Sequence, residues 1–193
     1  MISLTSKDAL LVIDIQNDFL PGGALAVPGG NDVVPVMNAY IDLFARRGLP
    51  IYATRDWHPA NHCSFREQGG PWPAHCVQGT WGAEFALALK LPDSAVIWSK
   101  ASNPEKEAYS DFQESDLAER LRSQGVERLF MGGLATDYCV LAGVTDALKL
   151  GFEVYLLVDA IRAVNVQPDN GQKAIDKMLG LGARPISLAD IEN

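Results

Sequence analysis

Short apolar runs alternate with helix-like patterns along the whole chain, and this alternation restricts the folds that the chain can adopt. Residues 9–15 form a nearly continuous apolar run, which is typical of a strand buried on both faces of a sheet. Strands and helices in alternation favour right-handed crossovers and a parallel sheet. We therefore expect an α/β protein with three layers (α/β/α), in which helices cover both faces of a mainly parallel sheet of six strands.

The same patterns place the individual elements. Further strands are expected at residues 50–55, 95–99, 128–132, 153–158 and 185–187. Helices are expected at residues 31–47, 115–125 and 136–150, and after Pro168. No repeat or linker divides the sequence, and 193 residues suit one domain, residues 1–193. Residues 56–82 have neither period and are rich in Gly, Pro, His and Trp, which predicts a long functional loop.

Composition argues against several classes of partner. The 16 Lys and Arg residues against 24 Asp and Glu residues give a net charge of −8, which disfavours nucleic acid and anionic membranes. No signal peptide is expected, and no apolar run reaches the roughly 20 residues of a membrane span. The three cysteines, Cys63, Cys76 and Cys139, do not form a disulfide pattern, so we expect free thiols in the cytoplasm. A homo-oligomer is compatible with these features.

Four reactive side chains lie at the carboxyl ends of the expected strands. Asp14, Asp56 and Lys100 each close or follow a strand, and Cys139 lies in the first turn of the helix after the fourth strand. Each has an ordinary alternative, as a solvated acid, a loop lysine or a buried core thiol. Because ligands of open α/β sheets bind at this edge of the sheet, the shared placement favours a joint function.

These groups fit the hydrolysis of a carbon–nitrogen bond. The helix N-terminus and Lys100 are expected to favour the thiolate of Cys139. Asp14 would take the thiol proton and return it to a leaving amine. Backbone amides of residues 132–136 would face the developing oxyanion. The residues alone do not identify which amide is hydrolysed.

A metal site is expected in the 56–82 loop, which holds all three histidines of the chain. Asp56 and His58 lie on the same side of an extended segment, and His75 would complete a set of two imidazoles and one carboxylate. Such a set suits Zn²⁺, Fe²⁺ or Mn²⁺ with open coordination positions. A surface loop without metal is the ordinary alternative. A closed zinc site is a weaker one, because its residues lack the usual spacing: His62, Cys63, His75 and Cys76.

Aromatic side chains are also concentrated in loops at this edge: Phe19, Trp57, Trp72, Trp81 and Tyr109. We expect Trp57 and Trp81 to plug the end of the sheet. Phe19 and Trp72 are the better candidates for flanking a planar heteroaromatic ligand.

Five motifs occur in order along nearly the whole chain. They are Asp-Ile-Gln-Asn-Asp-Phe at 14–19, Asp-Trp-His-Pro at 56–59, Trp-Pro-Ala-His-Cys at 72–76, Ser-Lys at 99–100 and Gly-x-x-Ala-Thr-Asp-Tyr-Cys at 132–139. Together they resemble the nicotinamidases, which belong to the isochorismatase-like cysteine hydrolases. The resemblance implies an isochorismatase-like, Rossmann-like fold. It also implies hydrolysis of nicotinamide, or of the related pyrazinamide, to the acid and ammonia.

The resemblance implies roles for single residues as well. Asp14, Lys100 and Cys139 would form the catalytic triad, with a thioester on Cys139. Asp56, His58 and His75 would hold the metal, Zn²⁺ or else Fe²⁺ or Mn²⁺, which orients the pyridine ring, and no organic cofactor is implied. A cis peptide bond between Leu134 and Ala135 would turn the Ala135 amide toward the oxyanion, beside that of Cys139. The substrate wall would consist of Phe19, Leu25, Trp72, Tyr109, Leu134, Ala135 and Tyr138. Some members add a metal ligand, for which Ser64 and Glu67 are the candidates.

Three other functions compete with this interpretation. A metal-independent amidase of the same superfamily, acting on a ureido or carbamoyl compound, would keep the triad but would not need the metal ligands. Isochorismatases resemble this chain less, because they lack both a cysteine nucleophile and the metal set. A metal-binding protein with a decayed site is disfavoured by the complete triad. The set of Asp56, His58 and His75 is what favours nicotinamide.

Overall fold

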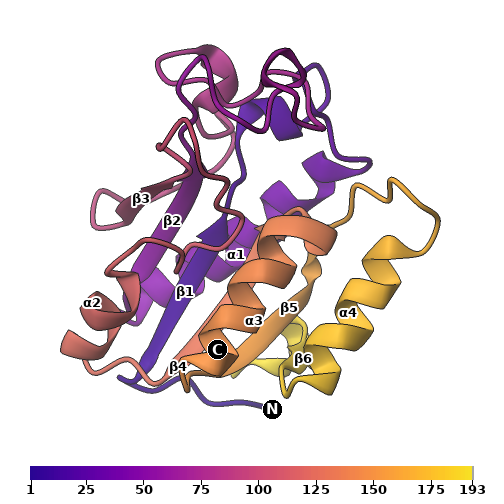
Figure 1. Ribbon diagram of the computed structural model, residues 1–193. Helices are drawn as coiled ribbons and strands as arrows, with labels where there is room; N and C mark the ends of the chain where they lie inside the picture. The colour runs from indigo at the N-terminus through magenta and orange to yellow at the C-terminus, as the bar shows by residue number, and fades with distance from the viewer. Residues whose placement is uncertain (193) are drawn as a thin grey trace.

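The computed structural model describes residues 1–192, and its centre is a six-stranded sheet (Figure 1). The strands are β1 (Asp8–Ile13), β2 (Ile51–Asp56), β3 (Val96–Lys100), β4 (Arg128–Leu134), β5 (Glu153–Arg162) and β6 (Arg184–Ile186). They lie in the order β3-β2-β1-β4-β5-β6, and each neighbouring pair is parallel. The expected sheet is therefore confirmed.

Helices cover both faces of this sheet, which gives the three expected layers (Figure 1). They are α1 (Val33–Arg46), α2 (Leu117–Ser123), α3 (Leu141–Lys149) and α4 (Asn170–Gly180). Side chains of β1 alternate between the faces. Leu10 and Val12 pack in the apolar cluster that includes α1, whereas Leu11 and Ile13 pack in the cluster that includes α2, α3 and α4. Burial on both sides explains why this strand is apolar at successive positions.

Some element ends differ from the expectations. β5 ends at Arg162 rather than at residue 158, because its pairing with β4 resumes after a register shift. The helix after β4 begins as a π-helical turn, Thr136–Val140, before it continues as α3. Asn31 lies in a short 3-10 turn, Gly30–Asp32, and so does not cap the first helix. These differences arise where tertiary contacts, rather than periodicity, decide the backbone path.

The order of the strands changes direction between β1 and β4, and this creates a crevice at their carboxyl ends. From β1 the chain adds β2 and β3 on one side, and from β4 it adds β5 and β6 on the other. At such a switch point the connections leave in opposite directions and open a site for a ligand. Gly133 allows β4 to approach β1 closely here, because a Cβ at this position would lie 2.0 Å from the carbonyl oxygen of Ile13.

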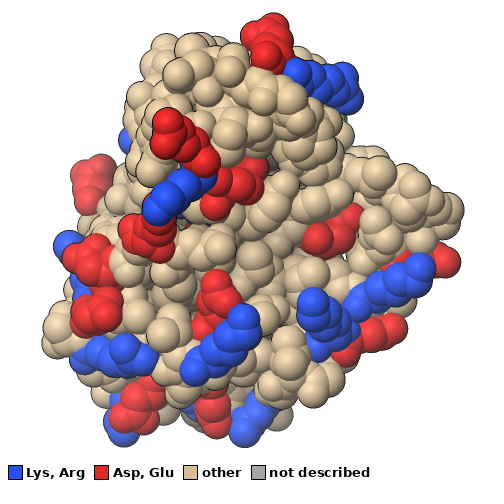
Figure 2. All heavy atoms as spheres, in the orientation of Figure 1, with Lys and Arg blue, Asp and Glu red and all other residues tan. Residues whose placement is uncertain are grey.

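Lys and Arg side chains lie next to Asp and Glu side chains over much of the face shown in Figure 2.

The longest helix, α1, has 14 residues. Within residues 1–192, no helix combines the length and the apolar character that crossing a membrane requires.

Candidate active site

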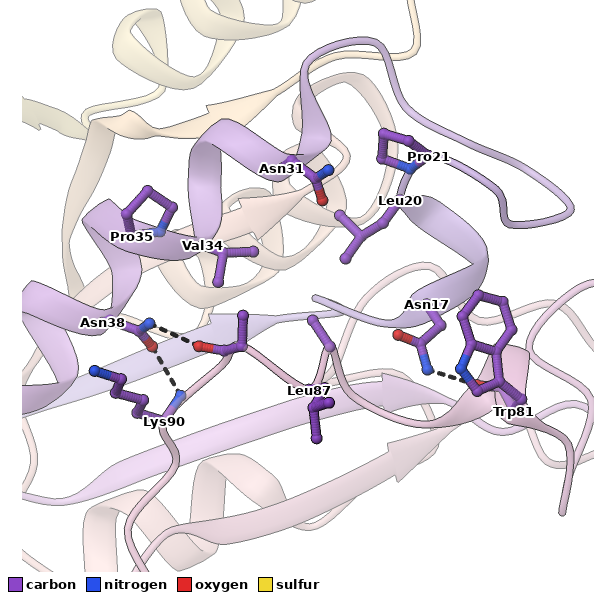
Figure 3. Close-up of a pocket in the computed structure, with 12 residues that line it drawn as sticks. Asn17, Leu20, Pro21, Asn31, Val34, Pro35, Asn38, Trp81, Leu87 and Lys90 are labelled. Carbon is purple, nitrogen blue, oxygen red and sulfur yellow. Dashed lines mark hydrogen bonds between the residues drawn. The ribbon is translucent and has the colours of Figure 1, made fainter.

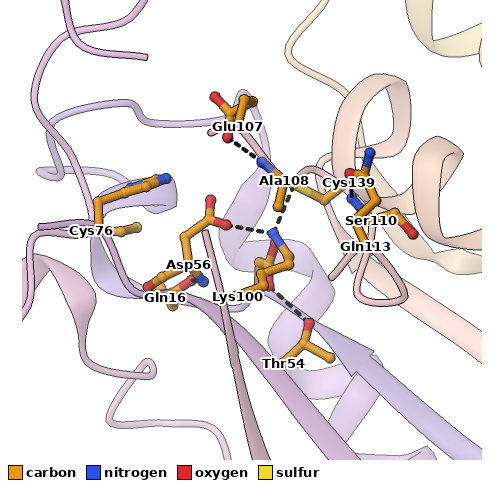
Figure 4. A network of polar contacts seen from close by, with 12 residues as sticks. Gln16, Thr54, Asp56, Cys76, Lys100, Glu107, Ala108, Ser110, Gln113 and Cys139 are labelled. Carbon is orange, nitrogen blue, oxygen red and sulfur yellow. Dashed lines mark hydrogen bonds and ion pairs between the residues drawn. The ribbon is translucent and has the colours of Figure 1, made fainter. Parts of the chain in front are cut away.

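Asp14, Asp56, Lys100 and Cys139 meet at the carboxyl ends of the neighbouring strands β1, β2, β3 and β4. Figure 4 shows Asp56, Lys100 and Cys139 in this group. The Nζ atom of Lys100 lies 2.8 Å from Oδ2 of Asp14 and 3.5 Å from Sγ of Cys139. The same Nζ pairs with Oδ1 of Asp56. All four residues are exposed by 5 % or less. The structure therefore brings together the four reactive groups that the strand ends predicted.

Neighbouring polar side chains fix the two carboxylates. Thr54 on β2 donates a hydrogen bond from Oγ1 to Oδ1 of Asp14, at 2.8 Å. Gln16 holds the backbone of Asp56 at both its N–H and its C=O, at 2.8 Å each. Sequence reasoning missed Thr54 and Gln16. The signal for Gln16 was its position two residues after Asp14, because the segment that leaves β1 passes alongside the end of β2.

The Lys100 ammonium is held charged by its two acidic neighbours. Burial alone would lower the pKa of Lys100, but Asp14 and Asp56 together raise it well above its usual value. Burial would likewise raise the pKa of Asp56, but Lys100 and the nearby His58 lower it below its usual value. A buried cation thus lies between two carboxyl groups, and their mutual attraction offsets part of the cost of burying these charges.

The surroundings of Cys139 favour the protonated thiol, whereas the helix N-terminus and Lys100 were expected to favour the thiolate. Burial raises the pKa of Cys139 well above its usual range; Lys100 acts against this, but Asp14 and Asp56 add to it. The pKa of Asp14 is also raised, first by burial and against the effect of Lys100. A raised pKa makes the Asp14 carboxylate a stronger base, so the thiol can lose its proton to Asp14 when it reacts.

Asp56, His58 and His75 offer donor atoms that all lie within 4.8 Å of one another. Nδ1 of His58 bonds the carbonyl of His75 at 3.0 Å, and Nδ1 of His75 bonds the carbonyl of Pro73 at 2.8 Å. A carbonyl only accepts, so each Nδ1 carries the proton and each Nε2 presents a lone pair. Burial lowers the pKa of His58 to about 4, which keeps that ring neutral. This donor set fits a divalent metal ion.

The residues considered as alternative or additional metal ligands are not part of this group. His62 uses Nδ1 on the Ser64 hydroxyl at 2.8 Å and Nε2 on the carbonyl of Lys106 at 3.0 Å, so neither ring nitrogen is free. Glu67 is exposed and belongs to no potential metal group within residues 1–192. The closed zinc site is not supported, because no such group in that range includes Cys63 or Cys76.

A small cavity lies in front of Cys139. Six of the seven expected wall residues line it: Phe19, Leu25, Trp72, Tyr109, Ala135 and Tyr138. Asp56, His75 and Cys139 line it as well, so the reactive groups face an aromatic pocket. Leu134 does not line it, because its side chain is 0 % exposed and packs in the core. Val164 does, and no sequence signal distinguished it from other apolar loop residues.

The peptide bond between Leu134 and Ala135 is cis, as the resemblance implied.

Of the two tryptophans expected to plug the sheet, Trp57 packs against the core and lies under the Arg55 guanidinium, 3.8 Å from the ring centre. Trp81 is 59 % exposed, so it is not a plug.

A larger hollow next to Trp81 is not the reaction site. Its wall includes Asn17, Leu20, Val34, Leu87 and Lys90 (Figure 3). None of its lining residues is Cys, His, Asp or Glu, so it offers neither a nucleophile nor metal ligands.

Comparison with known proteins agrees with this geometry. A family model for the isochorismatase domain matches residues 8–190. The nicotinamidase of Escherichia coli (strain K12) is 42% identical over 205 residues, which covers 95% of this chain and 96% of that protein. A pyrazinamidase of Pyrococcus horikoshii, crystallised in complex with zinc, has 53% identity and a TM-score of 0.91, and covers 94% of this chain and 99% of its own. PnC1 from L. infantum, crystallised with nicotinate, has 35% identity and a TM-score of 0.92, with coverage of 99% and 98%.

Proposed function

The chain belongs to the isochorismatase domain family, and we propose that it is a nicotinamidase, which hydrolyses nicotinamide to nicotinate and ammonia. One observation carries this proposal: the Cys139 thiol, two members of the metal-ligand set and the aromatic side chains all line the same small cavity. A planar ring that carries both a carboxamide and a metal-binding nitrogen satisfies all three features of this cavity.

Cys139 is the nucleophile and Asp14 is the base in the proposed reaction. Asp14 accepts the thiol proton, Sγ attacks the carboxamide carbon, and the Ala135 and Cys139 amides stabilise the oxyanion. Asp14 then protonates the nitrogen, the C–N bond breaks, and ammonia leaves a thioester behind. Water loses a proton to Asp14 and attacks the thioester, nicotinate leaves, and the proton returns to Cys139. Lys100 stays charged and orients Asp14 throughout, through the 2.8 Å ion pair.

Asp56, His58 and His75 are the proposed metal ligands, and zinc, iron or manganese suits them. A metal bound there would supply a Lewis acid for the pyridine nitrogen of the substrate. Phe19 and Trp72 flank the ring, and Leu25, Tyr109 and Tyr138 complete the wall. Pyrazinamide has the same carboxamide and a ring nitrogen in the same place, so it is a second substrate. No organic cofactor takes part. We propose that the released nicotinate is used in NAD salvage and that the enzyme works in the cytoplasm.

The rival substrate class is a ureido or carbamoyl compound. Such a substrate needs the same nucleophile but has no ring nitrogen for a metal to hold. It would leave the metal ligands without a function and the aromatic walls without a ring to pack against. The proposed preference is therefore for the pyridine and pyrazine carboxamides.

An ammonia-release assay tests the proposal. Protein supplied with zinc, iron or manganese is mixed with nicotinamide, pyrazinamide or a ureido compound, and ammonia is measured over time. We expect ammonia from the first two, and we expect Cys139→Ala to abolish it, because no other thiol reaches the cavity. Cys63→Ser is the matched control and should keep full activity. Ammonia from the ureido compound alone would replace the proposed substrate class, and an active Cys139→Ala variant would overturn the role of the thiol.

A further inference from the structure

Asp111 is a buried carboxyl group that the proposed reaction does not use. It lies in the segment between β3 and α2 and is 0 % exposed. Neither of its oxygens has a hydrogen-bond partner within residues 1–192. No hydrogen bond therefore joins Asp111 to the proposed metal ligands Asp56, His58 and His75. An ionised carboxylate without a partner in this position would be very costly. The group therefore needs either a counter-charge or a proton.

The groups around Asp111 do not supply a free counter-charge. The charged groups that face it are Asp14 after β1, Asp56 on β2 and Lys100 on β3. Lys100 is already paired with both of those carboxylates. On α3, Gly143 lies next to Asp111, because a Cβ at this position would lie 3.2 Å from Oδ2 of Asp111. The helix thus leaves room for the carboxyl group but brings no donor to it.

Thr54 connects Asp111 to the base of the reaction. Its hydroxyl donates to Oδ1 of Asp14 at 2.8 Å, and no hydrogen bond joins it to Asp111. An ionised Asp111 would nonetheless compete for this donor, because donation from Thr54 lowers the pKa of Asp111. A threonine hydroxyl has a single proton. Toward Asp111, Thr54 can therefore only accept, and only a protonated Asp111 has a hydrogen to give.

The surroundings of Asp14 and Asp111 stabilise the ionised form of the two carboxyl groups to different extents. Asp14 has an ammonium group at 2.8 Å and a hydroxyl donor at 2.8 Å, and both stabilise its ionised form. Asp111 has neither. Burial raises the pKa of Asp111 to about 8, and the charge of Asp14 adds to this effect while Lys100 opposes it. Burial raises the pKa of Asp14 as well, but the Lys100 ammonium acts against this, so Asp111 is the better group to hold a proton at neutral pH.

We propose that Asp111 is a positioning residue that stays protonated in the working enzyme and, through Thr54, keeps Asp14 ionised and ready to take the thiol proton. This inference rests on the proposed function only in assigning the base to Asp14. The proton of Asp111 is not transferred during the reaction. A neutral Asp111 leaves only two carboxylates, those of Asp14 and Asp56, beside the single positive charge of Lys100. It also leaves the Thr54 hydroxyl free to donate to Asp14.

Ionisation of Asp111 would harm the reaction in two ways. A second negative charge would oppose the formation of the thiolate and of the oxyanion. The Thr54 hydroxyl could then turn toward Asp111, so that Asp14 would lose a hydrogen bond. Activity should therefore fall on the alkaline side as Asp111 loses its proton.

Asp111→Asn tests the proposal, because an asparagine is a neutral group of the same shape whose NH₂ can donate to Thr54. Near neutral pH we expect kcat/KM for ammonia release to stay within about threefold of the wild type. The alkaline fall in kcat/KM should move up by about one pH unit or more. Asp116→Asn is the matched control, since Asp116 lies exposed in the same segment and should leave the pH profile unchanged.

Infrared spectroscopy of the metal-free protein gives a readout that needs no substrate. The carbonyl stretch of a neutral carboxylic acid should be present in the wild type at neutral pH and lose intensity in Asp111→Asn. The infrared measurement does not depend on the nicotinamide assay. The proposed nicotinamidase activity and the proposed protonation of Asp111 are therefore tested separately. Identical pH profiles for wild type and Asp111→Asn, an Asp111→Asn variant that folds and binds metal but is inactive at every pH, or an unchanged infrared spectrum would each overturn the inference.

Discussion

At the scale of single residues, the positive charge of Lys100 stabilises two buried carboxylates, those of Asp14 and Asp56. Its side chain is 2% exposed and pairs with Asp14 and Asp56, whose side chains are 0% and 7% exposed. Lys100→Met keeps the length of the side chain but leaves two buried carboxyl groups without a cation. We expect a loss of about 3–5 kcal/mol in the free energy of unfolding, measured with denaturant on the metal-free protein.

The control for this prediction is Lys7→Met. Lys7 pairs with Glu127 at 2.7 Å, but these side chains are 57% and 62% exposed. An exposed pair is screened by water, so the unfolding midpoint should barely move. Equal effects of the two substitutions would show that the buried pairs do not balance the charge of the site.

The residues that could be predicted are those whose position follows from the strands. Asp14, Lys100 and Cys139 were predicted because the ends of parallel strands meet at one edge of a sheet. Asp111 was not, because it lies in a segment without periodicity, where burial depends on which strands and helices pack around it. Leu134 was placed in the wall because it lies in the motif, but the end of β4 turns its side chain into the core.

At the scale of elements, Asp18 clamps the loops that carry the proposed metal and substrate sites. Its carboxylate accepts from the N–H of Ala24 at 2.9 Å and from the N–H of Cys76, next to His75, at 2.7 Å. Asp18→Asn replaces one oxygen by an NH₂ group, which cannot accept from a backbone N–H. We expect the affinity for zinc to fall by about 10-fold or more, measured by competition with a chromophoric chelator.

Asp137→Asn is a matched control for the clamp. Asp137 also accepts from two backbone N–H groups, those of Val164 and Asn165, at 2.9 Å each. It fixes the loop with the wall residue Val164, and no hydrogen bond recorded for the described residues links it to the metal ligands. This variant should raise KM and keep the affinity for zinc. If Asp18→Asn bound zinc as tightly as the wild type, the clamp would have no part in shaping the metal site.

Regular elements were predictable because their burial imposes a period, whereas the clamps and the π-helical turn have none. The apolar run of β1 follows from burial on both faces, and its position in the sheet follows from the alternation of strands and helices. The turn at Thr136–Val140 was expected to be ordinary helix, because nothing in its composition distinguishes the two. The clamps join positions as far apart as Asp18 and Cys76, and only the folded chain brings these together.

At the scale of the whole molecule, the fold and the proposed metal site are built from separate parts. The two clusters of buried apolar side chains on the faces of the sheet hold the strands and helices together. The three proposed metal ligands lie at the rim, on the end of β2 and in the loop that follows it. A structural zinc site would instead make folding depend on the metal.

Removal of the metal should therefore abolish activity and leave the fold in place. After treatment with a chelator, we expect loss of ammonia release from nicotinamide, an unchanged far-ultraviolet circular dichroism spectrum and a modest decrease in Tm. The decrease reflects only the lost binding energy, which is about 2.7 kcal/mol when the metal is present at about 100 times its Kd. Adding zinc, iron or manganese back should restore activity and Tm together. Unfolding on chelation would contradict this prediction, because it would mean that the loop at residues 56–82 holds the sheet together rather than the substrate.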